Sequence, residues 1–152
     1  MSSLLSKHYK VKNVSVKYVT AYNDRIIDNL VRKGRISQDD AVLIKDYLIE
    51  REIAGISNLK LKNDAYSLIN IRRTMNKDLR VASIHDLMRA LKTLRDKGLM
   101  QSTVMQYSVN VTPFFLWLIE NGHTDALSVY DLKKIRMKRP KSRSIKKEEL
   151  LE

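Results

Sequence analysis

A serine followed three residues later by an aspartate occurs three times in this chain, each time in front of a segment with apolar residues at helical spacing. In such a capping box the serine hydroxyl accepts a hydrogen bond from the backbone N–H three residues on, and the carboxylate accepts one from the serine N–H. The pair satisfies two donors that the first turn of a helix leaves free. The pattern therefore predicts helices that begin just after Ser37, Ser83 and Ser128.

Apolar residues at spacings of three and four also recur in three further segments, and such spacing places side chains on one face of a helix. The chain has only four glycines and two prolines, so it lacks the many tight turns of an all-β protein. We therefore expect an all-α fold with helices at 15–33, 38–53, 58–75, 84–97 and 102–121, and a short sixth helix after Ser128. The side chains expected to face the core are Val19, Tyr22, Ile26, Leu30, Ala41, Ile44, Leu48, Leu61, Ala65, Leu68, Met75, Val104, Tyr107, Val111, Phe114, Phe115 and Leu118.

The net charge of the chain is +12, and its sequence pI is near 9.9. Self-repulsion of this size lowers stability unless a polyanion offsets it, which makes nucleic acid the first candidate partner. An anionic membrane is a weaker candidate, because no helix pairs a lysine-rich face with a bulky apolar one. The chain has no cysteine and no apolar run of membrane-spanning length. We expect a cytoplasmic, nucleoid-associated protein with no membrane partner.

Residues that could carry catalysis are scattered. The three histidines, His8, His85 and His123, lie far apart, and no metal-ligand spacing or glycine-rich phosphate loop occurs. The acidic residues form no constellation with a nucleophile and a base. We therefore expect no metal, no cofactor and no small-molecule ligand, and no enzymatic activity in this chain.

The helix expected at 102–121 has an unusual second face, opposite its apolar stripe. Thr103, Gln106 and Asn110 follow one another at i, i+3 and i+7, with Ser102 beside them. Glutamine and asparagine amides can pair with adenine edges in the major groove, and hydroxyls can contact bases or phosphates. The free amides at a helix N-terminus also favour phosphate. The alternative is an ordinary solvated face, although the other solvated faces of this chain are rich in lysine and glutamate.

The helix expected at 58–75 carries a comparable outer face, in which cations accompany amides. This composition suits phosphate contacts with some base contacts, and a solvated basic face is an equally good interpretation of this helix alone. The residues of the face are Lys60, Lys62, Asn63, Ser67, Asn70 and Arg73.

The composition changes only near the C-terminus, where nine lysines and arginines and no acidic residue occur between 133 and 147. Such a run is typical of an extended or disordered linker. We expect a flexible arm at 1–13, an additional helix at 14–34, a helical domain at 35–132 and a basic linker at 133–152. The linker cations expected to contact phosphates are Lys138, Arg139, Lys141 and Arg143.

Several of these segments together resemble the core-binding domain of the tyrosine recombinase (phage integrase) family, whose last helix reads approximately "TvxqYlxxLxxFfxWLxxxG". The order of the matching segments agrees with the family over about residues 36–152. Three positions depart from the family. Met100 stands where a capping serine or threonine is usual, Asp64 where a tyrosine is common, and Lys146 where a capping threonine is usual. Arg35-Ile36-Ser37 before a helix is most similar to archaeal integrases. The other matching residues are Ile56-Ser57, Lys60, Leu68, Asp86-Leu87, Leu91, Gly98 to Tyr107, Val111, Phe114-Phe115, Trp117-Leu118, Gly122, Arg143, Ile145 and Glu148-Glu149-Leu150.

The resemblance implies an orthogonal four-helix, SAM-like bundle at 37–122 that grips one face of double-stranded DNA. In that family a following catalytic domain, which carries the arginines, histidines and nucleophilic tyrosine, grips the other face, and the full-length recombinase self-associates on DNA. This chain alone is then expected neither to cleave nor to ligate DNA. Two alternatives stay open: a stand-alone nucleic-acid-binding regulator or architectural protein, and a helical protein–protein adaptor.

Overall fold

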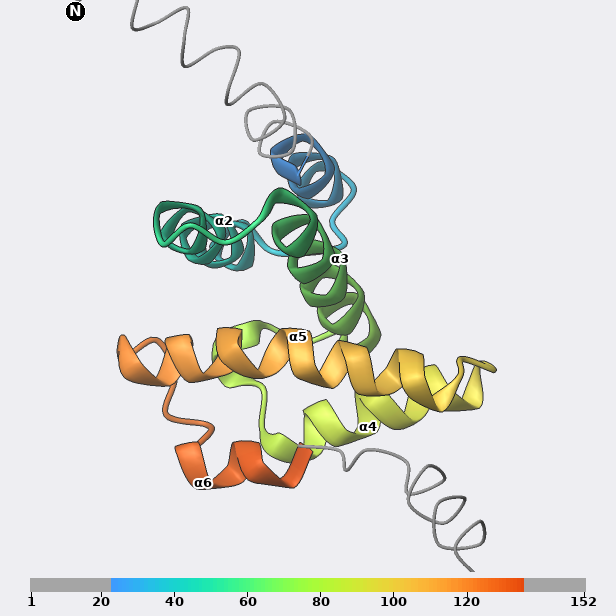
Figure 1. The fold of residues 1–152 in the computed structure, drawn as a ribbon. Helices are drawn as coiled ribbons and strands as arrows, with labels where there is room; N and C mark the ends of the chain where they lie inside the picture. The colour runs from blue at the N-terminus through green and yellow to red at the C-terminus, as the bar shows by residue number, and fades with distance from the viewer. Residues whose placement is uncertain (1–22, 136–152) are drawn as a thin grey trace, which may run out of the picture.

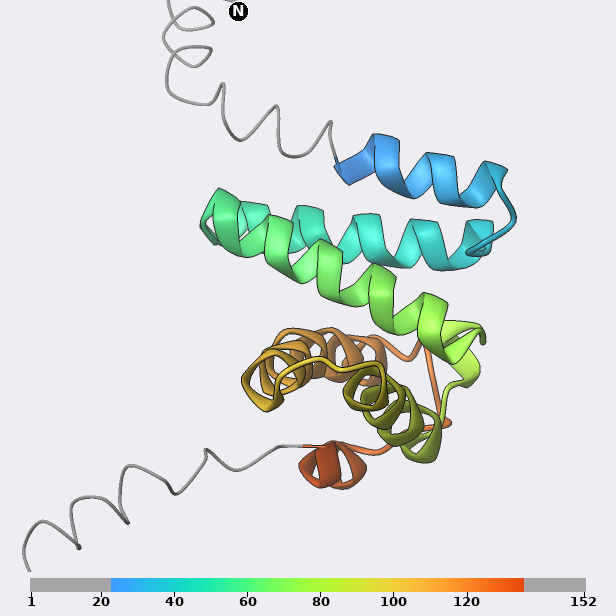
Figure 2. The same cartoon turned by 90° about the vertical axis from the view of Figure 1, so that its right-hand side faces the viewer.

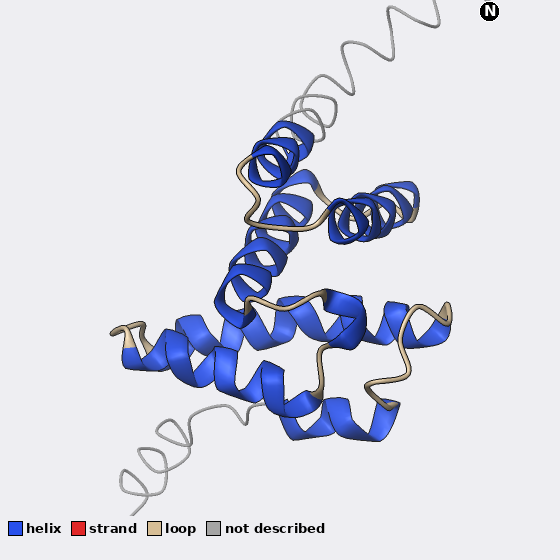
Figure 3. Ribbon diagram, turned by 180° about the vertical axis from the view of Figure 1, so that it is seen from behind, coloured by secondary structure: helices blue, strands red, loops and turns tan. Residues whose placement is uncertain are grey.

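The computed structural model describes residues 23–135, and all regular structure in that range is helical (Figures 1 and 3). The expected all-α class is therefore confirmed for this part of the chain. No helix within 23–135 is long and apolar enough to cross a membrane. The elements are a helix at 23–32, α2 (Gln38–Ile53), α3 (Asn58–Met75), the 3₁₀ turn η1 (Leu79–Val81), α4 (Ile84–Asp96), α5 (Gln101–Glu120), α6 (Val129–Leu132) and the 3₁₀ turn η2 (Lys133–Ile135).

The serine caps begin the helices where the sequence predicts. The hydroxyls of Ser83 and Ser128 accept from backbone N–H groups three residues on, and both boxes are completed by the aspartate. The box at Ser37 is only half formed. Its hydroxyl accepts from the Asp40 N–H at 3.2 Å, but the Asp40 carboxylate points into the core, where it accepts from Leu79 N–H and pairs with Arg72. The expectation that Asp40 reaches back to Ser37 is therefore wrong.

The capping box at Ser83 should make part of the stability depend on pH. The Asp86 carboxylate accepts from Ser83 N–H at 2.9 Å and from Lys77 Nζ at 3.0 Å. Chiefly through the Ser83 N–H, these contacts lower the pKa of Asp86 from 3.8 to about 2. A lowered folded-state pKa means that the carboxylate stabilises the fold above pH 3.8 and loses this effect as the pH falls through about 2.

Asp86→Ala is accordingly expected to lower the free energy of unfolding by about 1 kcal/mol near neutral pH. In urea titrations at successively lower pH, the difference from the wild type should shrink through the window set by the two pKa values. Asp96→Ala, at the exposed opposite end of α4, is the control and should show no comparable pH dependence. A deficit of Asp86→Ala that stayed constant down to the lowest pH would contradict this role.

The helices form two groups. Figure 2 shows the 23–32 helix, α2 and α3 in the upper group, and α4, α5 and α6 in the lower one. Helix α3 connects the groups, because it contacts α2 as well as α4 and α5. The apolar stripe of α5 lies at the centre, and the buried members of the predicted core include Val104, Val111, Phe114, Phe115 and Leu118. The stripe was therefore predicted correctly as core.

The helix at 23–32 differs in detail from its prediction. Ile26 and Leu30 are only half-buried, while Ile27 is completely buried. The side of this helix that packs on the rest of the protein is thus broader than the spacing indicated. An ion pair of 2.6 Å between Lys45 and Asp28 also joins the helix to α2. The expected core residues Val19 and Tyr22, and the arm at 1–13, lie outside the described residues.

Candidate nucleic-acid interface

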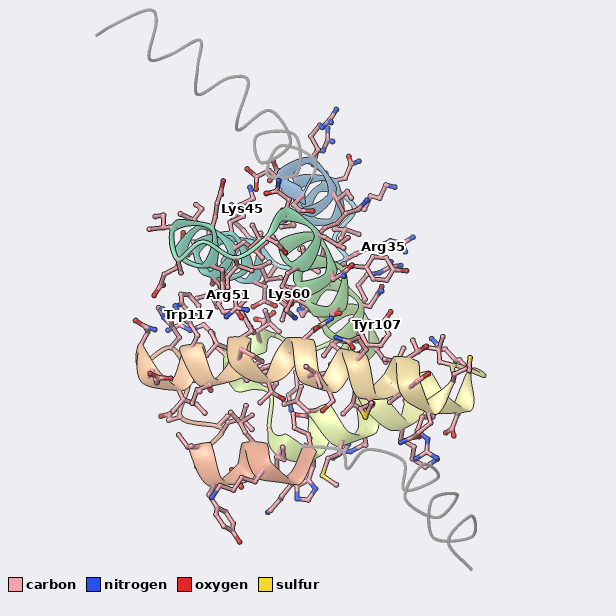
Figure 4. The ribbon with its side chains drawn as sticks, in the orientation of Figure 1. Arg35, Lys45, Arg51, Lys60, Tyr107 and Trp117 are labelled. Atoms are coloured by element: carbon pink, nitrogen blue, oxygen red, sulfur yellow. The ribbon has the colours of Figure 1, made fainter. Side chains whose placement is uncertain are left out.

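Helices α3 and α5 form an open groove with a volume of about 240 Å³. Figure 4 shows Lys60 and Tyr107 at the junction of these two helices. The groove gathers residues that lie about forty positions apart in sequence, and none of its lining residues is charged. They are Asn63, Tyr66, Ser67, Thr103, Gln106, Tyr107 and Asn110.

Most of the predicted binding residues of α3 and α5 reach the surface of the protein, and Asn63, Thr103 and Gln106 among them line the groove. Lys60 and Asn70 are half-buried, and the others of this set are exposed. The exposed ones are Lys62, Asn63, Arg73, Ser102, Thr103 and Gln106. The structure therefore brings the two predicted faces together into a single surface, which the sequence had presented as two separate helix faces.

Two predicted outer-face residues are buried instead. Asn110 is 2% exposed and Ser67 is 4% exposed, and Asn110 Nδ2 donates to Ser67 Oγ at 2.9 Å. A straight helix drifts by about 20° for every seven residues, so Asn110 does not stay directly in line with Thr103. At that level of α5 the packed helix α3 covers the position. The expectation that these two residues lie on a solvated face is wrong, and they form part of the floor of the groove.

Lys60 is held across the junction between the helices. Its Nζ lies 2.7 Å from Asp64 Oδ1 and 2.6 Å from Asn110 Oδ1. Asp64 is completely buried, and its second carboxylate oxygen lies 3.5 Å from Arg51. Lys60 and Arg51 thus balance the charge of the Asp64 carboxylate inside the protein, and Asp64 adds no exposed negative charge to the groove.

Two tyrosines of the groove were missed as candidate binding residues. Tyr66 is 65% exposed and lies between Asn63 and Asn70 on α3 at spacings of three and four, a signal that could have identified it. Tyr107 was expected only as core. Its ring is buried, but its hydroxyl accepts from Asn70 Nδ2 at 3.0 Å, and burial raises its pKa. Exposed aromatic side chains on which bases can stack are typical of surfaces that bind single-stranded nucleic acid.

The start of the basic segment is anchored beneath α5. Ser108 Oγ donates to the carbonyl of Ile135, and the Ile135 side chain is buried in the core. The predicted linker cations Lys138, Arg139, Lys141 and Arg143 lie outside the described residues. Within 23–135, no three histidine, cysteine, aspartate or glutamate side chains gather as a metal site would require.

No family model, curated protein or solved structure matches this chain. The resemblance to tyrosine recombinases therefore rests on the residues quoted above. What the structure adds is the groove between α3 and α5, with neutral hydrogen-bonding groups in its lining and the half-buried Lys60 bonded to Asn110 in its floor.

Proposed function

We propose that this chain is the DNA-binding, core-binding domain of a tyrosine recombinase of the archaeal integrase type. The observation that carries the proposal is the groove between α3 and α5, which joins two separately predicted polar faces and has no charged residue in its lining. Amides and hydroxyls of this kind suit base edges, and cations beside them suit phosphates. The strong positive charge of the chain supports the same partner.

In this proposal α2, α3, α4 and α5 form the SAM-like four-helix bundle, and the outer sides of α3 and α5 contact one face of the duplex. Lys62 and Arg73 contact phosphates, while Asn63, Thr103 and Gln106 approach base edges. The basic segment crosses to the other face of the DNA and contributes affinity through phosphates without sequence preference. The family resemblance supports a parent protein that self-associates on DNA and carries out integration or recombination through a separate catalytic domain.

The decisive experiment is a salt titration of duplex binding. If about six of the cations meet phosphates, log K plotted against log salt should have a slope near −5, from roughly −0.9 per phosphate. Affinity for a 30-bp duplex, measured by fluorescence anisotropy, should then fall by about 30-fold between about 100 and about 200 mM salt. A flat response over this range would contradict the proposal.

A pair of arginine variants locates the contacts. Arg73→Gln, at an exposed position of α3, should reduce the magnitude of the salt slope by about 0.9. Arg89→Gln is the matched control, because Arg89 is also exposed but lies on α4, which contributes no residue to the groove. Equal effects of the two variants would mean that binding does not use this surface.

A protein–protein adaptor is the second candidate function, and one observation favours it. Val42, Ile49 and Ile53 are 45%, 48% and 82% exposed, and they follow one another along α2 at i, i+7 and i+11. Exposed apolar side chains in one stripe are typical of an interaction surface. Absence of any salt-dependent DNA binding, together with loss of a protein partner on Ile53→Lys substitution, would favour this function over the first.

A further inference from the structure

The side-chain amide of Asn110 makes three hydrogen bonds inside the groove floor. Its Oδ1 accepts from Lys60 Nζ at 2.6 Å and from Gln106 Nε2 at 3.0 Å. Its Nδ2 donates to Ser67 Oγ at 2.9 Å. Asn110 is 2% exposed and its bond to Ser67 is buried, so water competes little with the bond that holds its amide in place. The network therefore connects a buried, well-ordered side chain to the exposed Gln106.

This contact restricts what Gln106 offers to a ligand. A glutamine on a helix surface normally samples many rotamers, and ordering it on binding weakens affinity. Here one N–H of Nε2 is engaged by Asn110, which leaves the other N–H and the acceptor Oε1 for the groove. The side chain is thus held in the protein before any ligand arrives, and the placement of its acceptor is set by Asn110.

A donor next to an acceptor on one side-chain amide matches a particular base edge. Adenine shows an N6–H donor beside the N7 acceptor in the major groove, whereas guanine shows the acceptors O6 and N7. Guanine would therefore place O6 against Gln106 Oε1, with no proton between the two oxygens. A Gln106 that is fixed by Asn110 can select between these purines, while a freely rotating amide could turn its donor towards guanine.

We propose that Asn110 is a positioning residue that fixes Gln106, so that the groove selects adenine over guanine in the major groove. This inference rests on the proposed function, because it assigns a base preference to the same DNA-binding surface. Asn110 itself does not touch the DNA. Lys60, which Asp64 holds, donates to the same oxygen of Asn110 and so fixes which end of the Asn110 amide faces Gln106.

The test compares three hairpin-closed duplexes: alternating A·T, alternating G·C, and alternating A·T with N6-methyladenine. The methyl group replaces the major-groove N–H of adenine, so it separates base reading from recognition of groove shape. The wild type should bind the unmodified A·T duplex at least about fivefold more tightly than the G·C duplex. Methylation should remove most of that preference.

Variants then assign the preference to the network. Asn110→Leu should reduce the A·T to G·C affinity ratio towards one, and Asn110→Ser does the same if the leucine variant does not fold. Asn110→Asp keeps an acceptor for Gln106 and should retain the ratio, while its charge lowers both affinities together. Ser108→Ala is the matched control, because it removes a buried hydrogen bond from the same helix without touching the groove, and should leave the ratio unchanged.

Gln106→Met completes a double-mutant cycle. It should abolish the ratio by itself, and adding Asn110→Leu or Asn110→Ser to it should change the ratio no further. A wild type that binds neither duplex overturns the proposed function. A wild type that binds both duplexes equally, or a ratio that survives in both Asn110→Leu and Asn110→Ser, overturns the positioning role and leaves the proposed function standing.

Discussion

Replacing Phe114 with alanine is expected to lower the free energy of unfolding by about 3–5 kcal/mol. Phe114 is completely buried in the C-terminal half of α5. Its ring packs edge-on against Tyr47 and Phe115, with centroid distances of 5.2 and 5.3 Å, and it stacks near Trp117. The variant loses the burial of the ring and leaves a cavity among aromatic side chains that cannot close over it. Urea or guanidinium unfolding curves measure the difference.

Val109→Ala is the matched control for this variant. Val109 lies on the same helix and is 54% exposed, so its truncation should change the free energy of unfolding by less than about 0.5 kcal/mol. A loss below about 1 kcal/mol for Phe114→Ala would contradict the central position of α5 in the core.

Asp40→Ala should destabilise the fold by a similar amount, about 3–5 kcal/mol, because it leaves the buried Arg72 guanidinium without its main partner. Asp40 is completely buried, pairs with Arg72 Nε, and accepts from Leu79 N–H at 3.1 Å. Burial raises the pKa of Asp40, while Arg72 and the Leu79 N–H act in the opposite direction. The Arg72 guanidinium therefore favours the charged form of the Asp40 carboxylate, which burial alone would disfavour.

Asp39→Ala controls for the loss of an acidic residue from the first turn of α2, because Asp39 is exposed. Its effect should stay within about 0.5 kcal/mol. The double variant Asp40→Ala/Arg72→Met should recover much of the loss, since removing both members of a buried ion pair is far less costly than removing one. Strictly additive effects of the two single substitutions would show that the pair is not coupled.

The helical elements could be predicted because their signals are local. The serine hydroxyls at 37, 83 and 128 satisfy amides only three residues away, so the helix starts do not depend on the rest of the fold. The apolar stripe of α5 is equally direct, because residues such as Val104, Val111 and Phe114 share one face whatever that face packs against. The same reasoning did not find the inward turn of Asp40, since a carboxylate at that position can reach either its cap or a distant Arg72.

The candidate binding surface could be predicted only in part. Thr103 and Gln106 on α5, and Asn63 on α3, are exposed as the spacing of polar residues indicated. Asn110 and Ser67 continued the same polar faces in sequence but are buried in the structure. Whether a polar residue faces water or another polar residue depends on which helix packs over it, and helical spacing contains no information on that.

The sequence by itself determined the all-α class, the helix starts at the serine caps and the apolar face of α5, because each follows from interactions within a few residues of one another. It also determined the large positive charge that supports the proposal of a DNA partner. Only the tertiary structure decided that α3 and α5 share one groove, that Lys60 and Gln106 meet on Asn110, and that Asp40 pairs with Arg72. These contacts join residues between four and fifty positions apart in the sequence. The contacts between different helices depend on the angles at which the helices cross, and the packing of the whole core sets those angles.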